Sequence, residues 1–317
     1  MILRQALSLA SRGRLSIMIF HRVLSAPDPL LLQEPAAADF EALVIHLKRR
    51  FSVLPLAEGV RRLYDGTLPA GALSLTFDDG YTDNLAVAAP ILARHGVPAT
   101  VFIATGYLDG ASMFNDTIIE AVRRAPAPAL DLAEQGLAVH PVASDAERRA
   151  AIDAIIGQVK YRPPGERLAQ AAAILRAAGA APPAGLMLDR AGVRKLAGFG
   201  VDVGAHTVTH PILAESTPAD AWREISDSKR DLEATTGAPL SLFAYPNGKP
   251  DADYKAEHVR MVREAGFAAA VTTAWGVASR DSDRLQLPRF TPWTRAPLKF
   301  DLMMLRNMRH GAEQRAA

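Results

Sequence analysis

An apolar run that ends in two adjacent acids is the most informative part of this chain: SLTFDDGY, residues 74–81. Its first half has the composition of a short buried strand. Asp78 and Asp79 follow where the strand ends, and Gly80 allows the chain to turn there. Two carboxylates this close disfavour each other's ionisation unless a cation neutralises one of them. The stretch therefore indicates a metal site with one acid free to act as a base, or a helix cap made by the acids.

On either side of this stretch, short apolar runs alternate with helical patterns, which is typical of a parallel sheet with crossover helices. The sequence predicts seven strands, at residues 15–20, 73–77, 100–104, 201–204, 240–244, 268–273 and 285–290. It predicts helices between them, at residues 39–50, 84–95, 189–197, 218–236 and 251–265. In a barrel of parallel strands, functional side chains collect at the rim formed by the carboxyl ends of the strands.

One part of the chain departs from this alternation. From about residue 125 to residue 185 the sequence is rich in Ala, Arg and Pro, and it predicts two helices, at 144–158 and 165–179. We interpret it as a helical insertion in a single catalytic domain that spans residues 1–317. Three roles stay open for the insertion: a lid over the site, a docking surface for a biosynthetic partner, or a long connection.

Composition excludes several classes of function. A net charge of +2 without a long basic cluster gives no reason to expect nucleic-acid binding. The chain has no cysteine, so any metal must be held by His, Asp or Glu. The first 14 residues lack the unbroken apolar run of a signal peptide, and no window has the ~18 apolar residues of a membrane span. We expect a cytoplasmic protein without a transmembrane segment, and leave open peripheral association with a membrane.

A second motif carries two histidines four residues apart: GAHTVTHP, residues 204–211. It follows a predicted strand directly, as the acid pair does, and it holds the only close pair among the eight histidines. His206 and His210 would lie on one side if the loop coils into a helical turn. Two histidines and one carboxylate are a ligand set that suits zinc, cobalt, nickel or iron, with positions left for water and substrate.

Together, TFDDG at residues 76–80 and HTVTHP at residues 206–211 resemble the first two signature motifs of the polysaccharide deacetylase family, the esterases with the NodB-like fold. The resemblance covers about residues 15–290, apart from the insertion. It implies an α/β fold, a distorted (β/α)7 barrel, and a hydrolase that removes acetyl groups from an N-acetylated glycan. Zinc is the expected divalent metal, with cobalt or nickel as alternatives.

Applied to this chain, the resemblance implies a role for each motif residue. Asp79, His206 and His210 would bind the metal, and Asp78 would be the general base. Asn247 stands at the position in the third motif where a backbone N–H stabilises the oxyanion of the reaction.

The later motifs differ from the family pattern. The third motif is usually Arg-x-Pro-Tyr, whereas residues 244–248 are AYPNG, with alanine in place of arginine. The late Leu-x-His that supplies the general acid is absent, because residues 287–290 are LPRF. We expect Arg289 to pair with Asp78 instead, and His21 to act as the acid. This arrangement resembles the subgroup that deacetylates poly-N-acetylglucosamine, and for both residues a structural role stays open.

Two aromatic residues follow predicted strands at the same rim. Tyr245 and Trp275 are the candidates for stacking on sugar rings. Two other functions stay open: the same metal chemistry on a cyclic amide, a lipid-linked sugar or an O-acetyl ester, and an inactive barrel that only binds glycan. The second acid of the Asp pair argues against a binding module, which has no use for a spare carboxylate.

Overall fold

The computed structural model describes residue 7 and residues 9–292, 294–308 and 315–316. The chain divides into two compact units. The first comprises Met1–Ala26, Gln33–Gly106 and Leu188–Ala317, and the second Pro27–Leu32 and Tyr107–Met187. The expected lack of a signal peptide depends in part on residues 1–6 and 8, which lie outside the described residues.

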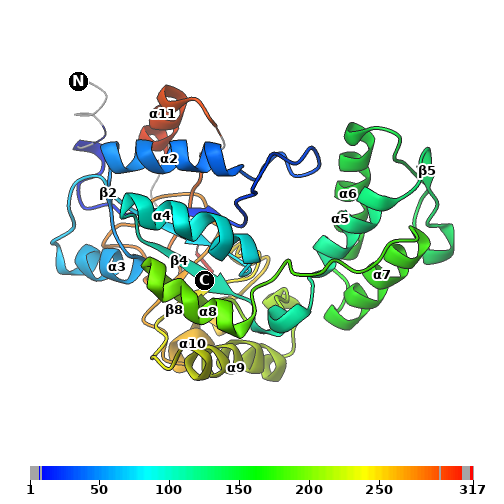
Figure 1. The fold of residues 1–317 in the computed structure, drawn as a ribbon. Helices are drawn as coiled ribbons and strands as arrows, with labels where there is room; N and C mark the ends of the chain where they lie inside the picture. Colours follow the sequence, from blue (N-terminus) through cyan, green and yellow to red (C-terminus); the bar gives the residue numbers. More distant parts are fainter. Residues whose placement is uncertain (1–6, 8, 293, 309–314, 317) are drawn as a thin grey trace. The chain divides into compact units, whose positions relative to one another are not determined.

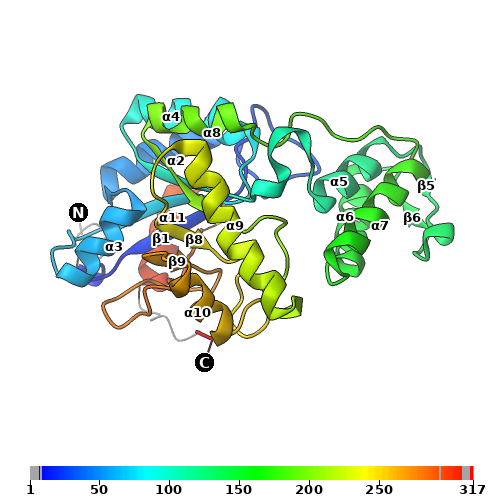
Figure 2. The same ribbon diagram turned by 90° about the horizontal axis from the view of Figure 1, so that it is seen from below.

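The first unit is built on a seven-stranded sheet with parallel pairings, in the order β1-β3-β4-β7-β8-β9, with β2 paired to the start of β3. Its strands are β1 (Ser16–Phe20), β2 (Ser52–Val53), β3 (Ala72–Phe77), β4 (Ala99–Ile103), β7 (Val201–Ala205), β8 (Leu242–Ala244) and β9 (Ala269–Val271). The sheet curls into a half-barrel with helices around it (Figures 1 and 2). The predicted α/β fold, a distorted (β/α) barrel, is confirmed.

The helices of this unit are α2 (Ala37–Arg50), α3 (Leu56–Asp65), α4 (Ala89–His95), α8 (Arg190–Leu196), α9 (Pro218–Thr236), α10 (Ala256–Glu264) and α11 (Pro297–Asn307). The local sequence explains the bounds of α9. Thr217 accepts the N–H of Asp220, Pro218 occupies the first turn, and Gly237 ends the helix with φ 71°. No helix in the described ranges is long and apolar enough to cross a bilayer.

The core inside the sheet combines side chains from β1, α3, β4, β8 and β9. Phe102 on β4 fills the space beside Gly204 on β7, where an added Cβ would lie 2.4 Å from the ring. The close contact between two neighbouring strands therefore requires glycine at this position.

The strand predicted at residues 285–290 is not one. Only Leu287 forms a bridge, with Val271 of β9. The next N–H in this ladder, that of Arg289, bonds to Ala274 O, and its expected acceptor, Thr272 O, accepts from the side chain of Arg289 instead. The N–H of Phe290 then bonds to Ile17 of β1, so this irregular segment joins the last strand to the first.

Other boundaries differ from the predictions in smaller ways. The helix expected at 84–95 begins as a π-helix, η1 (Asn84–Ala88), before α4. The helix expected at 251–265 begins only at Ala256, because Asp251 has φ 62° and residues 250–254 form a turn. The short strand β2 and the helices α3 and α11 were not among the predicted elements.

The second unit is mainly helical. Its principal elements are α5 (Phe114–Arg124), β5 (Ala129–Leu130), β6 (His140–Pro141), α6 (Asp145–Val159) and α7 (Pro164–Ala177). The helices enclose an apolar core of their own, and β5 pairs with β6 in antiparallel fashion. Ser144 and Glu147 form a capping box that starts α6. The helical insertion expected at about 125–185 lies in this unit, which begins earlier and includes α5.

Candidate metal and catalytic site

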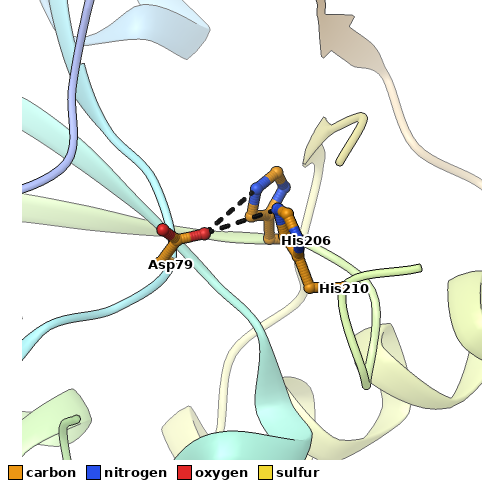
Figure 3. Close-up of side chains that lie close together, drawn as sticks. All are labelled: Asp79, His206 and His210. Atoms are coloured by element: carbon orange, nitrogen blue, oxygen red, sulfur yellow. Dashed lines mark ion pairs between the residues drawn. The ribbon is translucent and has the colours of Figure 1, made fainter. Parts of the chain in front are cut away.

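Three side chains from two loops converge at the carboxyl end of the sheet (Figure 3). Asp79 Oδ1 lies 3.6 Å from His206 Nε2 and 3.5 Å from His210 Nε2. One ligand atom from each residue lies within 4.8 Å of the other two. In the described part of the chain this is the only group of three His, Asp or Glu with such spacing.

Asp79 owes its position to a tight turn after β3. The N–H of Asp78 still bonds to Phe20 O in the ladder with β1. Asp79 and Gly80 then adopt φ 75° and 88°, and the N–H of Gly80 returns to Asp78 O at 3.0 Å. Two successive residues in the left-handed region reverse the chain at the rim. This backbone conformation is accessible to glycine but unfavourable for aspartate.

The two histidines lie on an irregular turn, not on the helical turn that we expected. Thr207 has φ 65° and His210 has φ 52°, and the N–H of His210 bonds to Thr207 Oγ1 at 3.1 Å. His206 Nδ1 is 2.8 Å from the carbonyl of Ala244. Since a carbonyl only accepts, Nδ1 carries the proton, and the lone pair of Nε2 faces Asp79.

These three residues fit a divalent cation. Burial raises the pKa of Asp79, and its Oδ1 is buried without a hydrogen-bond donor among the described residues. A buried carboxylate oxygen without a donor is unfavourable unless a cation faces it. The chemistry of the donors, one carboxylate oxygen and two imidazole nitrogens, is that of a zinc-type site with positions left for water.

Asp78 is held by Arg289. Arg289 Nη1 and Nη2 donate to Oδ1 and Oδ2 of Asp78, both at 2.7 Å. Nε donates to Thr272 O at 2.8 Å, and Nη1 also reaches Thr76 Oγ1 at 3.1 Å. Burial alone would raise the pKa of Asp78, but the attraction of Arg289, and then of His206, outweighs it and lowers the pKa to about 2. The ion pair expected for Arg289 is therefore present.

His21 and Asn247 lie near this centre. His21 directly follows β1, the strand that pairs with β3 and therefore ends at the same rim as Asp79. Asn247 has φ 57°, and its backbone N–H has no hydrogen-bond partner among the described residues. The roles predicted for these two residues stay predictions.

The two predicted stacking residues differ. The ring of Tyr245 is fully buried and stacks on Tyr254 with centroids 4.0 Å apart, so it has no free face for a sugar. That prediction does not agree with the structure, because the side chain turns into the core. Trp275 is 61% exposed, and its ring packs perpendicular to that of Phe290, with centroids 4.5 Å apart. Its neighbour Ala274 accepts the backbone N–H of Arg289, so Trp275 lies on the segment next to the ion pair.

Two residues that hold the histidine loop were missed by sequence reasoning. Glu224 on α9 accepts three hydrogen bonds from this loop, and Gly106 after β4 contacts it from the other side. Glu224 is one of many charged residues on the long helix α9, so nothing in its sequence position indicates that it contacts the histidine loop. Gly106 could have been suspected only as a glycine that follows a strand.

Comparison with known proteins agrees with this geometry. The family model "Polysaccharide deacetylase" matches residues 65–270. The chain belongs to the polysaccharide deacetylase family. Members of this family are hydrolases, and the match includes both the acid pair and the histidine pair.

The family relationship extends over most of the chain. YxkH of Bacillus subtilis (strain 168) is 22% identical over 279 residues, 87% of this chain and 71% of that protein. The deacetylase PplD of Streptococcus pyogenes, solved with acetate, has a TM-score of 0.61 at 20% identity and covers 93% of this chain and 98% of its own. A de-N-acetylase from Aggregatibacter actinomycetemcomitans has a TM-score of 0.53 at 14% identity, with coverage of 87% and 94%. At identities this low, the two structures support the fold of this chain and no finer property.

Proposed function

We propose that this protein is a metal-dependent hydrolase that removes N-acetyl groups from an N-acetylated polysaccharide or glycan precursor. The observation that carries the proposal is an ionised carboxylate that is not itself one of the proposed ligands and lies beside a metal-type ligand set. Asp79, His206 and His210 converge with their ligand atoms within 4.8 Å, and Asp78 is fixed next to them by Arg289.

The ligand set and the base have complementary properties. A divalent ion bound by Asp79, His206 and His210 would acidify a water molecule and polarise the acetyl carbonyl. Asp78, with a pKa of about 2, is ionised at neutral pH and is a weak base. A weak base suits a water that has already been acidified, and the bidentate bond to Arg289 keeps the carboxylate in one orientation for the proton transfer.

Two further residues are proposed for the remaining steps. The free backbone N–H of Asn247 is suited to stabilise the oxyanion that forms at the acetyl carbon. His21 would donate the proton that the leaving amine needs. Zinc is the metal that we propose, with cobalt or nickel as alternatives, because two imidazoles and one carboxylate suit all three.

The proposed substrate class rests on the site and on similar proteins. PplD was solved with acetate, the product of deacetylation, and the protein from Aggregatibacter is named a de-N-acetylase. Trp275 offers an exposed aromatic face on the segment next to Arg289, as expected for a sugar-binding surface. The docking role considered for the helical insertion stays a prediction.

The test is acetate release from N-acetylglucosamine oligomers by the purified full-length protein, stripped of metal and then supplied with Zn²⁺, Co²⁺ or Ni²⁺. We expect release that depends on the metal and that falls by about 10²- to 10⁴-fold in Asp78→Asn, with metal binding retained. Asp202→Asn, which changes an exposed carboxylate on β7, is the control and should leave the rate unchanged.

Each contrary result has a defined meaning. Release that is unchanged in Asp78→Asn would contradict its role as the base. Tight metal binding without release would favour a cyclic amide or an O-acetyl ester as substrate. No metal binding and no release would favour a barrel that only binds glycan.

A further inference from the structure

The loop that carries both histidines is held by a carboxylate outside the ligand set. Glu224 lies on α9, 15 residues after Thr209. Its Oε2 accepts the backbone N–H groups of Val208 and Thr209, at 2.8 Å each, and its Oε1 accepts the hydroxyl of Thr209 at 2.6 Å. Three hydrogen bonds from one carboxylate thus fall on the two residues in the middle of the His206–His210 loop.

The opposite side of the loop is held by the backbone that follows β4. The N–H of Thr105 donates to Thr207 O at 3.1 Å, and the N–H of Gly106 donates to Val208 O at 2.8 Å. The peptide groups of the loop are therefore bonded on one side by main chain and on the other side by Glu224.

The loop needs such support, because its backbone is unfavourable on its own. Thr207 and His210 both adopt positive φ, 65° and 52°, a conformation that residues with a Cβ rarely occupy. Such conformations persist where the surrounding contacts determine them. If the loop relaxed, His206 would keep its bond to Ala244 O, whereas His210 would turn away from Asp79.

We propose that Glu224 is a positioning residue that holds the His206–His210 loop in its metal-binding conformation before the metal arrives. The proposal rests on the proposed function only in requiring that this loop binds a metal. The three hydrogen bonds of Glu224 fall on Val208 and Thr209, which are not ligand residues, so it acts through the loop that carries the ligands. Partners of this kind commonly change metal affinity by about 10- to 100-fold.

Substitutions at position 224 separate hydrogen bonding from charge. In Glu224→Gln, the amide oxygen accepts both backbone N–H groups, and the NH₂ group donates to Thr209 Oγ1, so all three contacts persist without the charge. Glu224→Ala removes all three. Glu233→Ala is the matched control, because Glu233 lies on the same helix and accepts the N–H of Leu240 at 2.9 Å, away from the site.

The experiment measures the dissociation constants of Zn²⁺ and Co²⁺ for the metal-stripped full-length protein, by competition with a chelator, together with the visible spectrum of the Co²⁺ form. We expect Glu224→Ala to bind about 10- to 100-fold more weakly than the wild type, with an altered Co²⁺ spectrum. Glu224→Gln should stay within about 3-fold, with a wild-type spectrum, and Glu233→Ala should bind as the wild type does.

Wild-type affinity and spectrum in Glu224→Ala would overturn the proposal. An equal loss in Glu224→Gln would overturn the hydrogen-bond account, because that variant keeps the contacts. If Glu224→Ala does not fold, Glu224→Asp provides the test. Its side chain is one methylene shorter, so the carboxylate is withdrawn from the loop, and we expect metal binding to weaken about 5-fold. A wild-type protein that binds no metal would refute the proposed function itself, which is a different result from unchanged binding in the variant.

Discussion

The guanidinium of Arg289 binds both carboxylate oxygens of Asp78, at 2.7 Å each, although 211 residues separate them in sequence. Both side chains are buried, with exposed fractions of 1% and 2%. The pair fixes the plane of the carboxylate and keeps it ionised. In this family the usual partner of that acid is an arginine of the third motif, so the same ion pair is formed here from another part of the barrel.

Replacement of Arg289 by lysine tests this pair. An ammonium group keeps the charge but cannot bind both oxygens or retain the bonds to Thr272 and Thr76. We expect the rate of acetate release to fall about 100-fold and the free energy of unfolding to fall by about 2 kcal/mol, measured by urea denaturation. Arg284→Lys, at an arginine above the ring of Tyr64, is the control. A variant as active as the wild type would show that bidentate orientation is dispensable.

Gly106 provides a steric test of the histidine loop. A Cβ on Gly106 would lie 2.8 Å from Val208 O, closer than real contacts allow, so Gly106→Ala must displace the loop or the end of β4. We expect metal affinity to fall at least about 10-fold, measured by chelator competition. Gly157→Ala, in α6 with open space around it, should stabilise the protein by about 0.5–1 kcal/mol and leave metal affinity unchanged. Unchanged affinity in Gly106→Ala would mean that the loop tolerates the displacement.

Trp275 should contribute to substrate binding and not to the chemical step. We expect Trp275→Ala to raise KM for N-acetylglucosamine oligomers about 10-fold with kcat nearly unchanged, because a stacking contact is made equally in the ground state and the transition state. Steady-state kinetics over a series of oligomer lengths gives both constants. Trp222→Ala, at a partly exposed tryptophan on α9, should change neither. A fall in kcat alone would contradict a simple binding role.

His258 should make stability depend on pH. Burial lowers the pKa of its imidazole, whose Nδ1 accepts the N–H of Lys255 at the start of α10 and must be unprotonated to do so. The stabilising contribution of the neutral ring is thus fully present above the unfolded value of 6.5, and is lost as the pH falls below it. Between pH 7.5 and 5.5 the wild type should lose about 1 kcal/mol more unfolding free energy than His258→Gln. The prediction is contradicted if urea denaturation shows that the unfolding free energies of the two proteins change equally between the two pH values.

The convergence of Asp79, His206 and His210 could be predicted from the sequence because it follows mainly from the topology of the sheet. Asp79 and His206 each follow a strand of a parallel sheet, so the carboxyl ends of β3 and β7 bring them to one rim, with β4 between them. Neither pairing partners nor distances were needed for that inference. Arg289 was predicted only from the arginine missing in the third motif, and the packing of its guanidinium between Thr272, Thr76 and Asp78 could not be foreseen.

The failures have a common physical cause, which is the direction of side chains and backbone N–H groups. Tyr245 follows a strand, as a rim residue should, but its ring turns inward onto Tyr254. Residues 285–290 have the apolar character of a strand, but the ladder with β9 ends after Leu287 because the N–H of Arg289 bonds to Ala274 O. Glu224 looks like any other exposed helix charge until the loop that it binds is seen in three dimensions.

The junction at residues 287–291 also has a consequence for how the protein is made. All three proposed metal ligands lie within the first 210 residues, but the partner of the proposed base follows only at residue 289. A chain shortened before residue 287 would contain the three proposed ligands but would lack the arginine that orients Asp78. Orientation of Asp78 is thereby linked to completion of the barrel, because the segment between β9 and β1 is the one that carries its partner.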